Sequence, residues 1–158
     1  MSIKVIGIDP GQSGGLALVS RDANGAPVLH SAIMMPLSYP TKKPTISMDA
    51  AWSWLDPYPG PKAGFIENVH AMPRQGVSSS FQFGRMFGGA ELVLQSTCLR
   101  VFHVTPQAWK KHFGLGSDKN ASIAMATLLF GTDQHWKLKK HEGVAEAALI
   151  ALYGLGQI

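Results

Sequence analysis

Four of the ten acidic residues are placed where a carboxylate could take part in chemistry. Asp9 ends a largely apolar stretch at residues 3–8, and Glu67 ends a second one at residues 62–66. A carboxylate at the end of a buried strand costs free energy unless it is paired, hydrogen-bonded or bound to a cation. No arginine adjoins either residue in the sequence. Two such carboxylates on different strands therefore suggest a shared cation.

Glu142 and Glu146 lie four residues apart in a stretch made mostly of alanine, leucine and isoleucine. This spacing places both side chains on one face of a helix, where like charges repel each other. A positive partner would offset that repulsion. The alternative is that Glu142 begins the helix, where its charge favours the positive end of the dipole, and that Glu146 is a solvated surface residue.

The four residues together form a set of oxygen donors, and the single cysteine excludes a thiolate cluster. Oxygen donors of this kind suit Mg²⁺ or Mn²⁺ better than zinc. A pair of such ions, about 3.5–4 Å apart, can activate a water and stabilise the leaving oxygen during phosphodiester hydrolysis. The residues therefore indicate a metal-dependent hydrolytic site.

Length and composition limit the class of protein. We expect residues 1–158 to form a single domain, because 158 residues leave no room for a second sizeable one. Cys98 alone cannot form an intramolecular disulfide, which excludes a disulfide-stapled secreted scaffold. No stretch approaches the roughly 18 apolar residues of a membrane span, so we expect a soluble, intracellular protein with no membrane partner. The net charge of +4 suits a polyanionic partner without requiring one.

The pattern of apolar residues and turns predicts a mixed sheet with helices on its faces. Residues 3–9, 16–19 and 28–34 are predicted strands, and the tight turns between them indicate an antiparallel meander. Two further strands are predicted at 62–67 and 99–104. Helices are predicted at 47–55, 78–96, 117–130 and 142–155, with a short one that begins at Thr105 and Pro106. Residues 131–140 are expected to form a basic loop.

Several motifs resemble RuvC-type Holliday junction resolvases, and in particular their phage and prophage branch. IGIDPG at 6–11, with SGG at 13–15, resembles the first strand and turn of that family. FIENVHAMP at 65–73, followed by QGVSS at 75–79 and FGR at 83–85, is similar to the second acidic motif. VTP at 104–106 with WKK at 109–111, and HEGVAEAALIAL at 141–152, resemble the last strand with its following helix and the final acidic motif. The likeness covers nearly the whole chain, in order.

The resemblance implies an RNase H-like α/β fold, with a five-stranded mixed sheet of three antiparallel and then two parallel strands, flanked by helices. The first and fourth strands would be neighbours, which brings Asp9 and Glu67 together. Asp9, Glu67, Glu142 and Glu146 match the four metal-binding positions, although the family often has aspartate at the last two. Two Mg²⁺ ions, with Mn²⁺ as a substitute, would bind there, and Asp9 would bridge both. His141 is a candidate ligand or proton carrier, or a part of the neighbouring basic loop.

The resemblance also marks residues that would contact DNA. Lys110 resembles a catalytic lysine near the scissile phosphate, and Lys119 matches a second lysine at a different spacing; the alternative for each is a solvated helix lysine. Cellular members stack an aromatic side chain at the junction where this chain has His70. Met72, Phe81 and Phe83 are alternatives for stacking, although a buried core position is more common for such side chains. The further expected DNA contacts are basic or amide side chains: Arg74, Gln75, Arg85, Lys111, Lys137, Lys139 and Lys140, the last three beside His135 and Trp136.

The function implied by the resemblance is a metal-dependent, structure-selective DNA endonuclease that resolves Holliday junctions and other branched DNA. It would act as a homodimer through the glycine-containing helix at 78–96, without a small-molecule cofactor, in the cytoplasm of a bacterial host. The alternatives are a nuclease of the same fold that cuts flaps or RNA–DNA hybrids, and a non-catalytic junction-binding protein. An ATP-binding role for the turn at 9–15 would normally require two such domains.

Overall fold

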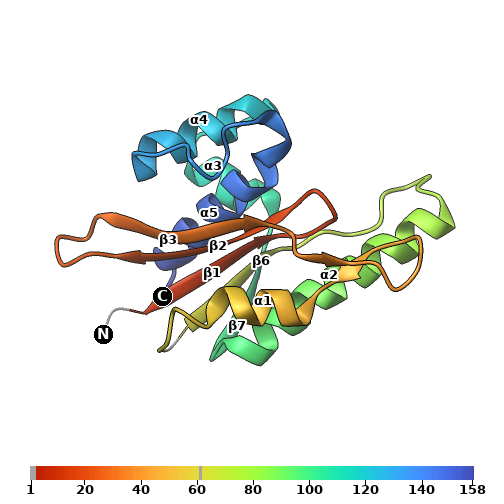
Figure 1. Ribbon diagram of the computed structural model, residues 1–158. Coiled ribbons are helices and arrows are strands. Elements are labelled where there is room, and N and C mark those ends of the chain that lie inside the picture. Colours follow the sequence, from red (N-terminus) through yellow and green to blue (C-terminus); the bar gives the residue numbers. More distant parts are fainter. Residues whose placement is uncertain (1–2, 61) are drawn as a thin grey trace.

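A mixed sheet of five strands lies at the centre of the computed structural model, which describes residues 3–60 and 62–158, apart from the side chain of Lys119 (Figure 1). The strand order is β3-β2-β1-β6-β7, with β1–β2 and β2–β3 antiparallel and β1–β6 and β6–β7 parallel. The strands are β1 (Lys4–Asp9), β2 (Gly15–Arg21), β3 (Pro27–Met34), β6 (Lys62–Glu67) and β7 (Arg100–Val104). The sheet therefore has the predicted arrangement, with the first and fourth long strands as neighbours.

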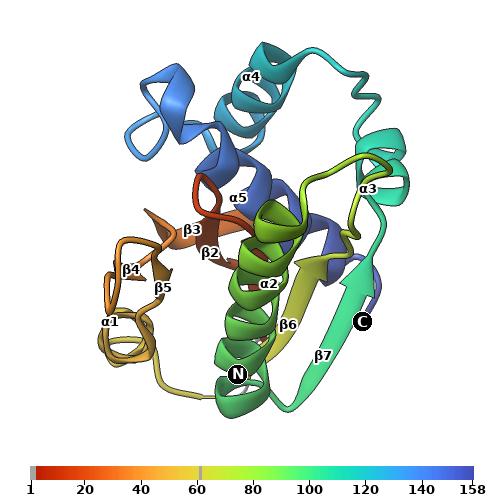
Figure 2. The same cartoon turned by 90° about the vertical axis from the view of Figure 1, so that its right-hand side faces the viewer.

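Helices cover both faces of the sheet. Above it in Figure 1 lie α3 (Pro106–His112), α4 (Lys119–Phe130) and α5 (Glu142–Leu155), and below it lie α1 (Met48–Leu55) and α2 (Val77–Thr97). Figure 2 shows α2 lying along β6 and β7 on the second face. Side chains alternate between the faces: Val5 joins the core under α5, while Ile6 and Ile8 join the core over α1 and α2. Within the described residues, no helix is both long enough and apolar enough to cross a membrane.

The structure differs from the sequence-based expectation in three places. A short hairpin, β4 (Leu37–Ser38) with β5 (Thr45–Ile46), was not predicted, because two residues per strand give no detectable alternation. Helix α2 extends one residue beyond each end of the predicted helix at 78–96 and is continuous over 21 residues. The expected loop at 131–140 ends in a single 3₁₀ turn, η1 (Lys139–His141), which leads directly into α5.

Helix starts follow the predicted capping chemistry. Ser47, Thr105 and Asp118 each accept a hydrogen bond from a backbone N–H in the first turn of α1, α3 and α4 respectively. Pro106 follows Thr105 at the start of α3, where its missing N–H costs nothing. These caps fix where α1, α3 and α4 begin.

Helix α5 packs on β1 and β2 at a distance that only glycine permits. A Cβ added at Gly7, in the middle of β1, would lie 2.5 Å from the backbone nitrogen of Ala151 and would overlap the carbonyl oxygen of Ala147. A Cβ at Gly143, in the first turn of α5, would lie 2.6 Å from the Cα of Gly14. The helix backbone therefore rests directly on the strand and on the turn after it.

Substitution of Gly7 tests this close contact. Gly7→Ala is expected to lower the free energy of unfolding by about 2–3 kcal/mol, because the added methyl group forces α5 away from β1. Gly116→Ala is the control, since an added Cβ there meets nothing within 4 Å, and it should change stability by less than about 0.5 kcal/mol. Urea denaturation followed by circular dichroism measures both. Equal stabilities of the two variants would contradict the proposed packing.

Candidate active site

Asp9 lies at the carboxyl end of β1, in the wall of an open pocket. The register pairs Ile8 with Ile66 in parallel strands, so the residues that follow them, Asp9 and Glu67, reach the same edge of the sheet. The pocket has a volume of about 610 Å³ and is lined by the turn after β1, by the start of α5 and by side chains from α2 and η1. Asp9 is therefore accessible to a ligand in the pocket.

Helix α5 supplies two further carboxylates to this pocket. Glu142 is its first residue and Glu146 follows one turn later, so both point from the same face. A Cβ at Gly143 would lie 3.0 Å from Oδ2 of Asp9, which shows how near the first turn of the helix comes to that carboxylate. Glu146 is 9% exposed, so it is not the solvated surface residue of the alternative interpretation. The expected grouping of Asp9, Glu142 and Glu146 is present.

Glu67 lies at the same edge but is not part of the pocket wall. Its side chain is 9% exposed, and its Oε2 accepts a hydrogen bond of 2.7 Å from the indole nitrogen of Trp109. Glu67 is close enough to Asp9 and Glu146 for its charge to raise the pKa of both. Glu67 therefore belongs to the same electrostatic cluster while one of its oxygens is held by α3.

Two residues that the sequence analysis did not identify hold the carboxylates in place. Trp109 is fully buried and donates to Glu67, and Ser122, 3% exposed, donates from its hydroxyl to Oε1 of Glu146 at 3.0 Å. Each bond engages one carboxylate oxygen. The sequence offered one signal for Ser122, which lies between Ala121 and Ile123 in a predicted helix. A hydroxyl group that is buried in a helix needs a hydrogen-bond partner.

The carboxylates carry more negative charge than their surroundings compensate. Burial raises the pKa of Asp9 well above its usual range, and the charges of Glu146, Glu67 and Glu142 raise it further. Burial is also the largest cause that raises the pKa of Glu67 and of Glu146. Lys110 opposes the rise at all three residues, and the hydrogen bonds from Trp109 and Ser122 oppose it at their own partners. The cluster therefore favours the arrival of positive charge.

Lys110 supplies part of that charge from the side of the cluster. Its Nζ lies 4.0 Å from Oε1 of Glu146 and 5.4 Å from the centre of the Trp109 ring, and a third of its side chain remains exposed. One ammonium group at the side of the cluster cannot neutralise four carboxylates. A hard divalent cation fits the donor set and the surplus charge. Among residues 3–60 and 62–158, however, no three His, Cys, Asp or Glu side chains are arranged to hold a metal ion as they stand, so metal binding would require side-chain rotation.

The predicted basic residues divide into two groups. Lys139 and Lys140 line the pocket beside Glu142. The other side chains lie outside it: Lys137 is exposed before η1, and Lys111 lines a separate cavity with Lys110. Lys119 begins α4, but its side chain lies outside the described residues. Nδ1 of His141 accepts a hydrogen bond of 3.4 Å from the backbone N–H of Leu138, so this ring closes the turn and does not line the pocket.

The segment between β6 and α2 is exposed, as a DNA-contacting loop would be. His70 and Arg74 are exposed, Arg74 has a φ of 69°, and Gln75 accepts a hydrogen bond from the backbone N–H of Met72. Arg85 lies 6.0 Å from the centre of the Phe81 ring on the surface of α2.

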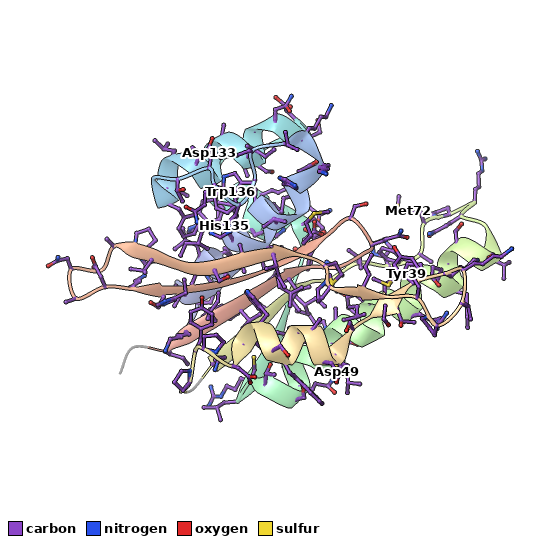
Figure 3. All side chains as sticks on the ribbon, in the orientation of Figure 1. Tyr39, Asp49, Met72, Asp133, His135 and Trp136 are labelled. Carbon is purple, nitrogen blue, oxygen red and sulfur yellow. The ribbon has the colours of Figure 1, made fainter. Side chains whose placement is uncertain are left out.

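Three aromatic or sulfur-containing side chains differ from expectation. Met72 and Phe81 are 64% and 69% exposed, so the core burial expected for such residues is wrong for both. Trp136 was grouped with the basic loop but is fully buried, and its indole nitrogen donates to the hydroxyl of Thr127. Figure 3 shows Trp136 against α4, on the opposite side of the sheet from Asp49 on α1. Trp136 therefore stabilises the loop from within and does not face a ligand.

Comparison with known proteins identifies the fold. No family model matches the chain, and no curated protein sequence matches it. Among solved structures, Thermus thermophilus RuvC in complex with a Holliday junction substrate matches with a TM-score of 0.64 and 16% identity, over 95% of this chain and 91% of that one. A second Thermus thermophilus RuvC structure gives 0.65 and 16%, over 95% and 92%. The yeast mitochondrial Holliday junction resolvase Ydc2 gives 0.59 and 14%, over 94% and 76%.

These matches establish the architecture predicted from the sequence. The chain has the RNase H-like fold seen in RuvC, with the same five-stranded mixed sheet and flanking helices. Its structural neighbours are RuvC and a mitochondrial Holliday junction resolvase. At 14–16% identity, the likeness extends to the fold and no further.

The raised pKa of Asp9 predicts a specific pH dependence of stability. A carboxyl whose pKa is higher in the folded than in the unfolded state stabilises the fold at low pH, and that stability is lost as the pH rises through the folded-state pKa. Asp9→Asn removes this loss. In EDTA at pH 7, the variant should be more stable than the wild type by about 1–2 kcal/mol, as is common when a strained functional residue is replaced.

Urea unfolding at pH 7 and at pH 4 measures this difference. The gain should shrink at pH 4, where the native Asp9 carboxyl already binds a proton. A variant that is less stable than the wild type at pH 7, or a gain of equal size at both pH values, would show that Asp9 is not held as a destabilised carboxylate.

Proposed function

We propose that the protein is a divalent-metal-dependent endonuclease that cuts Holliday junctions and other branched DNA by hydrolysing phosphodiester bonds. The observation that supports this most strongly is the common pocket of Asp9, Glu142 and Glu146, with Lys139 and Lys140 in its wall. The fold adds support, because one solved structure that shares it is bound to a Holliday junction substrate. The motifs in the sequence lead us to propose further that the protein belongs to the phage and prophage branch and acts in the cytoplasm of a bacterial host.

Asp9, Glu67, Glu142 and Glu146 would hold Mg²⁺ or Mn²⁺, two ions per site. When bound, such ions supply an activated water and charge stabilisation for the leaving oxygen. The chain itself presents the carboxylates: Trp109 and Ser122 engage one oxygen each of Glu67 and Glu146, which leaves the second oxygen of each for a cation.

Basic residues around the carboxylates would position the DNA. Lys139 and Lys140 lie at the rim of the pocket, where they would bind phosphates of the backbone without reading sequence. Lys110 lies on the other side, next to Glu146. A phosphate that enters between these lysines would lie against the carboxylate cluster, and repulsion between the phosphate and the carboxylates makes a bound cation necessary for its approach.

Asp9→Asn tests the catalytic proposal. The variant should cleave a labelled four-way junction more than about 100-fold more slowly than the wild type in Mg²⁺, because a shared metal ligand has lost its charge. Its affinity for the junction in Ca²⁺ should stay within about twofold. Asp49→Asn is the matched control, since Asp49 is an exposed carboxylate on α1, away from the pocket (Figure 3), and it should cleave normally.

The same assay separates the alternatives. Cleavage of junctions by Asp9→Asn at the wild-type rate would refute the assignment of the site. Faster cleavage of flaps or RNA–DNA hybrids than of junctions would favour a different nuclease of the same fold. Tight junction binding by the wild type without any nicking in Mg²⁺ or Mn²⁺ would favour a non-catalytic binding protein.

We further propose that the protein acts as a homodimer through α2, which presents an apolar stripe to the outside. Val77, Phe81 and Leu92 are 88%, 69% and 53% exposed. Gly84 and Gly88 lie on the same face of the helix, and a Cβ added at either glycine would have no neighbour within 4 Å. Small residues between large apolar ones let a second helix approach closely. A two-fold dimer would also give a four-way junction two symmetric sites, as paired cuts require.

Gly88→Arg tests the dimer. Sedimentation velocity should show a dimer for the wild type and a monomer for the variant, because a charged side chain at the centre of the stripe prevents close approach. Ala124→Arg, at an exposed position of α4, is the control and should remain dimeric. A wild-type protein that is monomeric at micromolar concentration, or a dimeric Gly88→Arg variant, would refute the proposed interface.

A further inference from the structure

A second cavity, of about 430 Å³, adjoins the acidic pocket. The two share a wall, because Gln12 and Phe83 line both. The remainder of the second cavity is formed by the β4–β5 hairpin, by Gln75 in the loop before α2, and by the first turns of α2. A nucleic-acid strand that is bound in the acidic pocket could therefore continue into the second cavity.

The chemistry of the second cavity is opposite to that of the first. Tyr39 is 61% exposed, and Lys42 and Lys43 beside it are exposed as well. The segments that form the cavity, residues 36–46 and 68–85, contain no aspartate or glutamate. An aromatic ring next to two lysines, with no carboxylate in the cavity wall, is the combination that binds single-stranded nucleic acid by stacking and phosphate neutralisation.

Contacts within the described residues fix the hairpin in this position. The ammonium group of Lys43 donates to the hydroxyl of Ser78 in the first turn of α2, and the side chain of Gln82 donates to the carbonyl oxygen of Pro44 at 2.5 Å. Figure 3 shows Tyr39 at the same end of the molecule as Met72 in the loop before α2. The hairpin therefore forms a fixed wall opposite that loop.

Gln82 provides an additional polar group. Its carboxamide oxygen is buried and, within the part of the chain that the structure describes, has no hydrogen-bond partner. A buried acceptor without a partner costs free energy. A donor that enters the cavity, such as the exocyclic amino group of a base, would recover that cost.

On the basis of the proposed function, we propose that the second cavity binds one unpaired nucleotide of the strand whose neighbouring phosphate lies at the acidic pocket. The base stacks on Tyr39 with Phe83 nearby, and the phosphate lies between Lys42 and Lys43. A base can enter a cavity of this size only when it has left the duplex, as it does most readily where pairing is already interrupted. The subsite therefore selects branched over continuous DNA.

Binding assays with catalytically inactive protein test this subsite separately from cleavage. In an Asp9→Asn background and Ca²⁺, fluorescence anisotropy compares affinity for a four-way junction and for a linear duplex of the same sequence. Tyr39→Ala and Lys42→Ala should each weaken junction binding by about tenfold, while their duplex binding changes by less than about twofold. Tyr39→Phe should retain the affinity, because it keeps the ring. Lys42→Ala should also lower the slope of log affinity against log salt by about 1.

Arg21→Ala is the matched control for loss of a positive charge, since Arg21 lies near the β2–β3 turn and donates to the backbone of Gly25. It should bind both DNAs like the parent. Unchanged junction affinity of Tyr39→Ala and Lys42→Ala would overturn the subsite and leave the proposed function intact. Equal losses for junction and duplex would also overturn it, because the hairpin would then be a general DNA contact. If the Asp9→Asn parent binds no junction at all, the proposed function itself fails.

Discussion

The backbone of α5 lies in direct contact with β1, and that contact places Glu142 and Glu146 beside Asp9. Gly7 and Gly143 leave no room for a side chain between helix and strand. Because the helix backbone approaches the strand this closely, its first turn lies beside the carboxyl end of β1, where Asp9 lies. The parallel pairing of β1 with β6 brings Glu67 to the same edge. The four carboxylates are therefore brought together by backbone packing and strand pairing, although their like charges repel each other.

This arrangement opposes the stability of the fold. Buried carboxylates that raise one another's pKa values destabilise the native state at neutral pH, and natural proteins retain such costs mainly at functional sites. Lys110, Trp109 and Ser122 reduce the cost in part and from one side. The open side of the cluster faces the pocket, where a divalent cation would complete the neutralisation. Lysines also line the neighbouring cavity, whose wall contains no carboxylate.

Local sequence features were sufficient for most of the strands and helices and for the shared face of Glu142 and Glu146. Three such features act over only a few residues. The β-branched run at residues 3–8 predicted β1, and the breaker pair at Pro10 and Gly11 predicted its end. The spacing of Glu142 and Glu146 predicted that both lie on one face of a helix. The neighbouring position of the first and fourth long strands came from the resemblance to a known family. The topology of the sheet then confirmed it.

Contacts between distant residues could not be predicted in the same way. Trp109 and Glu67 are 42 residues apart, and Ser122 and Glu146 are 24 apart, so no periodicity links them. Trp136 looked like part of a basic surface because its neighbours are lysines and histidine, whereas its ring packs inward near Phe130. The second cavity was not predicted because its walls come from a hairpin too short to give a pattern and from a helix 30 residues further on.

We propose that the carboxylates of β1, β6 and α5 jointly hold divalent cations. X-ray diffraction from crystals soaked in Mn²⁺, measured at the manganese absorption edge, tests it most directly, because the anomalous signal locates the ions independently of any assay of activity. Two neighbouring anomalous peaks are expected at this cluster, with oxygens of Asp9, Glu67, Glu142 and Glu146 as ligands. An ordered, accessible pocket without any peak under saturating Mn²⁺, or ions bound only at other surface carboxylates, would contradict it.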